Sequence, residues 1–238
     1  MSDALDRSVP GSGRGVRIAV VDSGVHADHP HVQGVAGGVG IAADGTENQD
    51  YVDRLGHGTA VTAAIKEKAP ASELLAVKIF DRALAAEADV LVRAIEWAAR
   101  SGVQLVNLSL GTARPERESS LSEAIASSAR AGVIVVAAGP SDGVRWLPGS
   151  LPGVLSVQVD WTCPRDKYRV GVEDGRVVCR ASGFAREIPG VPPALNLKGV
   201  SFAVANMTGF AARALEARRG ATLTELIDVL AAAPVGSP

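Results

Sequence analysis

The stretch Val16-Arg17-Ile18-Ala19-Val20-Val21, which ends in Asp22-Ser23-Gly24, decides the fold class. Its apolar and largely β-branched residues predict a strand that is buried on both faces, and Asp-Ser-Gly is typical of the turn that follows such a strand. Similar runs recur along the chain. We therefore predict further strands at residues 74–79, 103–110, 133–138 and 155–160.

The segments between these runs are rich in alanine and favour helices. We predict helices at residues 85–100, at 120–130, from about Ser201 to Arg218, and at 222–233. Ser120-x-x-Glu123 and Thr222-x-x-Glu225 are predicted to be capping boxes at two of the helix starts. Strands and helices alternate, so the fold class is α/β, a three-layer α/β/α sandwich with a mostly parallel central sheet.

Length and composition restrict the class of protein. The chain has 238 residues, which suits one domain, and we place that domain at residues 16–234 after a flexible N-terminal segment, residues 1–15. The formal net charge of −2 argues against a nucleic-acid partner or an anionic membrane surface. No apolar run is long enough for a membrane span, and residues 1–15 do not form an export signal. We expect a cytoplasmic protein whose oligomeric state the sequence leaves open.

Two cysteines, Cys163 and Cys179, lie on either side of a predicted β-hairpin, residues 168–172 and 176–179. Asp174-Gly175 between the two arms is a typical hairpin turn. The cysteines could pair across it, although a reducing compartment would keep both thiols free. Both possibilities remain open from the sequence.

Three distant segments contain the reactive groups. Asp22 ends a predicted strand, His57 lies in Gly56-His57-Gly58-Thr59, and Ser201 lies at the start of a predicted helix. A serine hydroxyl is a weak nucleophile that needs a neutral imidazole to take its proton, and a carboxylate orients that imidazole. A helix N-terminus supplies backbone N–H groups where an oxyanion would form. These parts are those of a nucleophilic triad.

The chain resembles the subtilisin-like serine proteases, or subtilases (peptidase family S8), over residues 16–217. The family's aspartate, histidine and serine motifs are matched in order by residues 20–25, 56–59 and 199–203. The resemblance implies a serine endopeptidase in which Ser201 attacks the carbonyl, His57 acts as base and then as acid, and Asp22 orients His57.

Two more segments are similar to the family's substrate-binding strands, and the resemblance assigns substrate contacts to Ser109, Leu110, Gly111, Ala137, Ala138 and Gly139. The expected substrate is an extended peptide or an unstructured protein segment, which would add a strand beside residues 109–111. We expect no cofactor. His26, His29 and His31 are close in sequence, but their spacing is weak evidence of a metal site.

The departures from the family pattern concern the oxyanion region, which comprises Pro140, Ser141 and Ser201. Pro140 stands where the family has an asparagine whose amide donates to the oxyanion, and proline has no donor to offer. Loss of such a donor costs about 10²- to 10³-fold in turnover, so we predict a slow enzyme unless Ser141 or a cation at Lys198 compensates.

The resemblance also bears on the biological role. The family's calcium-binding loop is missing after His57, and we expect a chain without an inhibitory prodomain, which suggests an intracellular or pathway-dedicated enzyme. A processing protease, such as a leader peptidase that matures a biosynthetic peptide, is the resulting hypothesis. The alternatives are a pseudoprotease that binds peptides without cleaving them, and an enzyme that transfers the acyl group to an amine.

Overall fold

The computed structural model describes residues 5–80, 88–173 and 175–235. The strands in these ranges are β1 (Arg17–Asp22), β2 (Gly37–Ile41), β3 (Glu47–Asn48), β4 (Glu73–Lys78), β5 (Leu105–Leu108), β6 (Ile134–Ala138), β7 (Val154–Val159), β8 (Tyr168–Glu173) and β9 (Arg176–Ala181). The helices are α1 (His57–Lys68), α2 (Ala88–Arg100), α3 (Glu118–Arg130), α4 (Val200–Ala217) and α5 (Leu223–Ala232), with 3₁₀ turns at Pro115–Arg117 and Pro193–Leu195.

The strands form one sheet in the order β3-β2-β4-β1-β5-β6-β7-β9-β8. The two edge strands β3 and β8 run antiparallel to their neighbours, and the other pairs are parallel. After β1 the chain forms β2, β3 and β4 on one side of it and then crosses to β5 on the other side, so the strand order reverses beside β1. The connections that leave the carboxyl ends of β1 and β5 run in opposite directions. Ligands of open α/β sheets bind at such a point.

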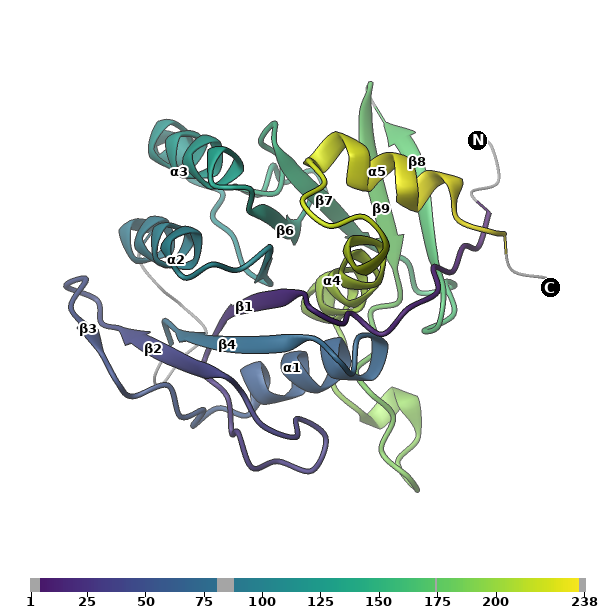
Figure 1. Ribbon diagram of the computed structural model, residues 1–238, viewed down its shortest axis with the longest axis horizontal. Helices are drawn as coiled ribbons and strands as arrows, with labels where there is room; N and C mark the ends of the chain where they lie inside the picture. The colour runs from purple at the N-terminus through teal and green to yellow at the C-terminus, as the bar shows by residue number, and fades with distance from the viewer. Residues whose placement is uncertain (1–4, 81–87, 174, 236–238) are drawn as a thin grey trace.

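Helices cover both faces of the sheet, which confirms the predicted three-layer fold. Helices α2 and α3 lie side by side on one face, and α4 lies on the other with α1 and α5 beside it (Figure 1). Strand β1 contacts both layers: Ile18 and Val20 belong to the core under α1 and α4, and Ala19 and Val21 to the core under α2 and α3. This double burial explains why β1 has no polar face.

Strand β2 is not among the predicted strands, because its sequence is rich in glycine. Close backbone contacts explain this composition: a Cβ added at Gly38 would lie 2.5 Å from the Ala76 carbonyl oxygen, and one at Gly40 would lie 2.4 Å from the Asp50 carbonyl oxygen. Close contacts of β2 with β4 and with the Asp50 backbone therefore require glycine, and the hydrophobic pattern of this segment does not indicate a strand.

One predicted capping box is present and the other is wrong. Thr222 caps α5, since the Glu225 N–H donates to Thr222 Oγ1 at 3.3 Å and the Glu225 carboxylate accepts from the Thr222 N–H at 2.9 Å. Helix α3, in contrast, begins two residues before Ser120, and its N-cap Arg117 makes no side-chain cap. The Ser120 hydroxyl instead donates back to the Arg117 carbonyl at 3.1 Å. Residues 85–87 of the helix predicted at 85–100 lie outside the described residues.

Residues 5–15, predicted to be flexible, lie against the domain instead. Val9 is buried in the core under α4, the Arg7 N–H donates to the Tyr168 carbonyl at 2.8 Å, and the Ser12 N–H donates to Glu216 at 2.6 Å. The two ends of the described chain meet at the same edge, near β8 and α5 (Figure 1). Short polar segments of this kind look loose in sequence because their partners are backbone groups far along the chain.

The predicted hairpin is present as β8 and β9, which pair antiparallel from Tyr168 to Glu173. Cys163 and Cys179 are both free and buried, and burial raises the pKa of each thiol to about 12. Neither is therefore a ready nucleophile.

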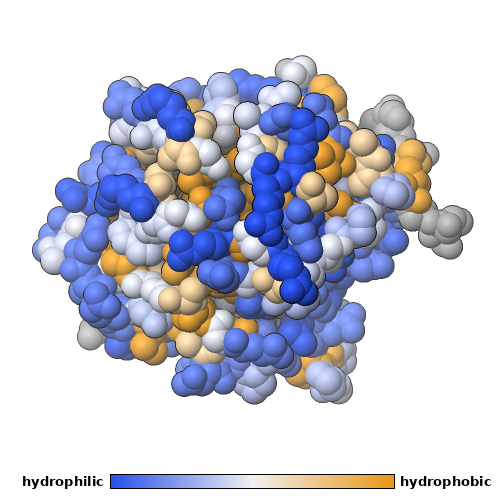
Figure 2. All heavy atoms as spheres, viewed as in Figure 1, coloured by the Kyte–Doolittle hydropathy of each residue, from blue (hydrophilic) through white to orange (hydrophobic). Residues whose placement is uncertain are grey.

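Polar side chains with scattered apolar ones cover the face of the molecule in Figure 2. None of the helices described here has the length and apolar character to cross a bilayer.

Candidate active site

The structure brings Asp22 and His57 into direct contact. Asp22 is the last residue of β1 and is 1% exposed, and His57 is the first residue of α1. Their hydrogen bond joins His57 Nδ1 to Asp22 Oδ1 at 2.7 Å. Gly58 makes the approach possible, since a Cβ there would lie 2.1 Å from the Gly24 carbonyl oxygen. This geometry leaves the second ring nitrogen of His57 free to act on a hydroxyl.

The pKa of His57 is shifted by opposing effects. Burial lowers it, while the hydrogen bond and charge of Asp22 and the charge of Asp53 raise it, and the net result is a pKa above the ordinary 6.5. The folded state therefore stabilises the imidazolium. That contribution to stability is complete below pH 6.5 and is lost as the pH rises through the folded-state pKa.

This shift predicts the pH dependence of Ser201 reactivity. Only neutral His57 can accept the hydroxyl proton, so we expect the rate of Ser201 labelling by a fluorophosphonate to rise with pH and to reach half its plateau above pH 6.5. Labelling rates measured from pH 5 to 9 in constant ionic strength provide the test. A midpoint at or below 6.5, or a flat profile, contradicts the assigned role of the Asp22–His57 pair.

A second buried carboxylate, Asp53, holds the start of α1 in place. It accepts hydrogen bonds from the Ser23 hydroxyl, from the N–H groups of Leu55 and Gly56, and from both the N–H and the hydroxyl of Thr59, at 2.6 to 2.9 Å. Ser23 in turn accepts from the N–H of the residue after His57 at 2.9 Å. Burial raises the pKa of Asp53, and these donors more than offset it, so the pKa is lowered overall.

Removal of this carboxylate should destabilise the protein. We expect Asp53→Ala to lower the free energy of unfolding by about 3 kcal/mol, because several buried donors lose their acceptor. Urea denaturation measures the change. Asp166→Ala is the matched control: Asp166 is exposed and lies 3.9 Å from Lys167 Nζ, so its loss should cost less than about 1 kcal/mol. Equal effects of the two substitutions would rule out the anchoring role of Asp53.

Ser201 is the second residue of α4, directly after Val200. Gly199 is the N-cap of this helix, with a φ of 152° that favours glycine, and no hydrogen bond among the described residues uses the Ser201 N–H. That N–H is available to an oxyanion. The His57 ring lies next to the start of α4, with its centroid 5.9 Å from that of Phe202.

The Ser201 hydroxyl points to the end of β5 in this structure. It donates to the Ser109 carbonyl at 3.3 Å, and within the described chain no hydrogen bond joins it to His57. Catalytic hydrogen bonds are often incomplete without substrate. The structure thus unites Asp22 with His57 and places Ser201 on the helix turn whose Phe202 ring lies beside the His57 ring.

The predicted substrate strand lies against the nucleophile. The Ser109 hydroxyl contacts the Ser201 carbonyl at 3.5 Å, in addition to the bond just described. Behind it, the buried Asn107 donates to the Ser109 hydroxyl at 2.9 Å and accepts from Thr208 of α4 at 3.0 Å. Strand β5 and α4 are therefore tied together at the point where a peptide would bind.

Ser141 and Lys198 are predicted from the sequence as groups that could replace a donor at Pro140, and the structure shows what each contacts. The Ser141 N–H donates to the Val144 carbonyl at 3.1 Å, and the Ser141 hydroxyl accepts from Trp146 Nε1 at 3.2 Å, which leaves its own proton available. Lys198 is exposed and pairs by its backbone with Phe184. Of the three groups, the Ser141 hydroxyl has the clearest capacity to donate.

Comparison with known proteins gives the family. A model of the subtilase family of peptidases matches residues 13–159, which is more than half of the chain. The chain belongs to the subtilase family. The similar relatives include Subtilisin from Bacillus pumilus, 30% identical over 56% of this subtilase and 50% of the relative. M-protease from Shouchella clausii is 29% identical over 84% and 54%, and Subtilisin Savinase from Lederbergia lenta is 29% identical over 84% and 76%.

This subtilase spans about half the length of the first curated relatives that it matches. Among solved structures, the crystal structure of a cold adapted subtilisin-like serine proteinase matches 96% of this chain and 88% of its own, with a TM-score of 0.74 and 20% identity. At that identity the likeness shows the fold alone.

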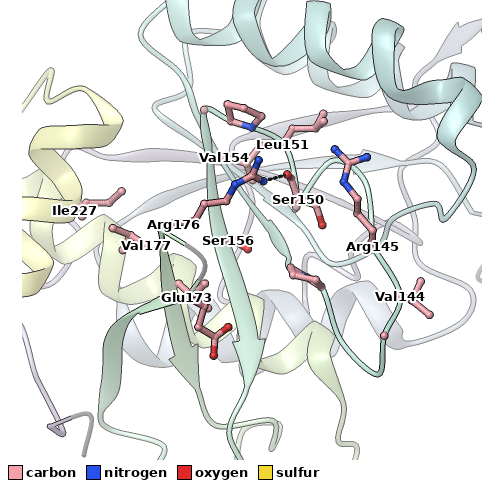
Figure 3. Close-up of a pocket in the computed structure, with 16 residues that line it drawn as sticks. Val144, Arg145, Ser150, Leu151, Val154, Ser156, Glu173, Arg176, Val177 and Ile227 are labelled. Carbon is pink, nitrogen blue, oxygen red and sulfur yellow. Dashed lines mark hydrogen bonds between the residues drawn. The ribbon is translucent and has the colours of Figure 1, made fainter. Parts of the chain in front are cut away.

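Two cavities flank the segment that follows β6 in this subtilase. One, of about 660 Å³, is lined by Pro140, Ser141 and Val200 and so reaches the residue before the nucleophile. The other, of about 760 Å³, lies between this segment and α5, where Arg176 donates to the Ser150 carbonyl (Figure 3). Neither lining includes one of the three triad candidates, and the first cavity is the nearer of the two to the site because it reaches Val200, the residue before Ser201.

Several residues that shape the site carry no signal in the sequence. Asp53 and Trp146 resemble ordinary loop residues, and Gln158, whose amide donates to the Pro140 carbonyl at 3.2 Å, follows a predicted strand pattern. The three histidines at 26, 29 and 31 belong to no group of three potential metal ligands in the described ranges. Asp53 lies four residues before His57, and only the structure shows that it accepts from the N–H groups of Gly56 and Thr59.

Proposed function

We propose that this subtilase is a serine endopeptidase that hydrolyses peptide bonds in extended segments of a peptide or unstructured protein. The observation that carries the proposal is the 2.7 Å bond between His57 and the buried Asp22, with the start of α4 beside the His57 ring. An imidazole that is oriented by a buried carboxylate and lies next to a helix-terminal serine is suited to acyl transfer.

In the proposed reaction, Ser201 Oγ turns from the Ser109 carbonyl to His57 Nε2 and attacks the substrate carbonyl carbon. The hydroxyl proton passes to His57, and the oxyanion accepts from the Ser201 N–H. His57 then gives the proton to the leaving amine as the C–N bond breaks, which leaves an acyl group on Ser201. A water molecule then attacks the acyl carbon while His57 takes one of its protons. The bond from that carbon to Ser201 Oγ breaks, and His57 returns the proton to Ser201 Oγ as the product acid leaves.

The substrate class follows from the end of β5. A peptide that adds a strand there must present a free backbone edge, which folded proteins rarely expose. We extend the proposal to a processing role, the removal of a leader segment from a biosynthetic peptide, because a slow enzyme with a weakened oxyanion site suits a dedicated substrate better than general digestion. This role rests on analogy and on Pro140.

The test is cleavage of an unfolded substrate. A reduced and alkylated protein is incubated with the enzyme and with Ser201→Ala, and new N-termini are identified by mass spectrometry. The proposal expects cleavage by the wild-type chain alone. Equal cleavage by both proteins would mean a contaminating protease, and cleavage by neither would contradict the proposal.

A pseudoprotease is the second candidate, and one observation favours it: the Ser201 hydroxyl is bonded to Ser109 rather than to His57. In that case the site binds extended peptides without acylation. Retention of an unfolded peptide by the wild-type chain and by Ser201→Ala alike, with no cleavage and no phosphonylation of Ser201, would establish this alternative.

A further inference from the structure

The segment between β6 and β7 returns across the ends of both strands that are assigned to the substrate. Thr112 and Leu147 exchange two backbone hydrogen bonds of 2.8 Å, so the segment pairs with the chain just after Gly111. A Cβ added at Gly149 would lie 1.8 Å from the Ala138 carbonyl oxygen, so the same segment also touches the end of β6. The space between the two strand ends is therefore closed on one side.

Trp146 fills this closed side. A Cβ added at Gly111 would lie 3.7 Å from Trp146 Cβ, and Trp146 Nε1 donates to the Ser141 hydroxyl at 3.2 Å. The half-buried indole thus extends from the end of one substrate strand to the oxyanion region. Its neighbours Val144 and Arg145 line the cavity of Figure 3, and Trp146 does not. The Trp146 side chain therefore runs from beside Gly111 to Ser141, outside that cavity.

We propose that Trp146 is a specificity-determining residue that restricts the substrate residue whose carbonyl is attacked to glycine, alanine or serine. This inference rests on the proposed function. A side chain that enters between Gly111 and Gly139 meets the indole, and the glycines offer no side chain that could move aside. A larger residue must displace the indole and break its bond to Ser141, which leaves a polar group unpaired.

Peptidyl diphenyl phosphonates test the subsite without requiring turnover. Ser201 Oγ forms a bond to phosphorus, the phosphorus–phenoxide bond breaks, and the hydroxyl proton leaves with the phenol by way of His57. Two probes differ only in an alanine or a phenylalanine side chain next to phosphorus. We expect the wild-type chain to react at least about tenfold faster with the alanine probe, and Trp146→Ala to lower this rate ratio at least about tenfold.

Two further variants separate the volume of the indole from other effects. Trp146→Phe keeps most of the bulk without the N–H and should retain more than half of the wild-type preference on a logarithmic scale. Trp97→Ala removes another half-buried indole, which lies on α2 and packs against the core under α2 and α3, and should leave the ratio unchanged within about twofold. The ratio of the two labelling rates is used because a change in oxyanion stabilisation by Ser141 in a variant would affect both probes equally.

The outcomes distinguish this inference from the proposed function. A small fluorophosphonate that labels Ser201 in all variants shows that the nucleophile is intact. If the wild-type chain then prefers the phenylalanine probe, or if Trp146→Ala keeps the wild-type ratio, the role of Trp146 is overturned and the protease assignment stands. If the small reagent labels no variant, the proposed function fails, and the inference fails with it.

Discussion

Substitution His57→Ala is expected to lower kcat/KM for an unfolded peptide substrate by about 10⁴-fold or more, because the loss of one triad member removes the coordinated proton transfer. The Ser201 hydroxyl would keep its proton, and its present acceptor, the Ser109 carbonyl, cannot take it away. Initial rates at pH 8 measure the effect in the wild-type chain and the variant.

His26→Ala is the matched control for this experiment. His26 is exposed, and its backbone makes its hydrogen bonds: the N–H donates to the Thr59 hydroxyl and the carbonyl accepts from the His29 N–H. We expect its kcat/KM to remain within about twofold of the wild-type value, in line with ordinary surface substitutions. Circular dichroism spectra of both variants check the fold. A loss of less than about tenfold in His57→Ala would remove the imidazole from the reaction.

Substitution Pro140→Asn is expected to raise kcat by about 10²- to 10³-fold, the contribution of one oxyanion-hole donor. The change restores an amide where the family has one and leaves the Pro140 carbonyl, which accepts from Gln158, as a backbone group in the variant. Because the donor acts on charge that develops in the transition state, KM should change much less than kcat.

Steady-state kinetics with one peptide substrate decide this point, with Pro152→Asn as a control for the loss of an exposed proline elsewhere in the same region. An unchanged or lower kcat in Pro140→Asn would mean that another donor already serves the oxyanion. The Ser141 hydroxyl is then the first group to test, because its proton is free while it accepts from Trp146.

The sequence predicts the layers of the fold and the hairpin at the β8 edge well, but it does not predict β2 and β3 at the other edge. Strand β1 is recognisable because burial on both faces requires a run such as Ile18 to Val21. Strand β2 is not recognisable, because close backbone contacts require Gly38 and Gly40 at positions where a typical buried strand has apolar residues. Local patterns report what a residue buries, and they do not report which distant backbone lies against it.

The same limit applies to the site. Asp22, His57 and Ser201 lie in motifs whose residue types follow from the chemistry, so the sequence is enough to propose them. Asp53 and Trp146 act through the placement of other groups, and their contacts span loops that local patterns do not connect. The false capping box at Ser120 is the converse case, in which a local pattern is present and the helix starts elsewhere.

The central claim is that His57 activates Ser201, although the two are not hydrogen-bonded in this structure. The most direct measurement is reaction with a small fluorophosphonate, followed by mass spectrometry of the intact chain and of its peptides. The account predicts a single adduct on Ser201 that is absent, at equal exposure, from His57→Ala. An unlabelled wild-type chain, or Ser201 labelled as fast without the imidazole as with it, would contradict the account.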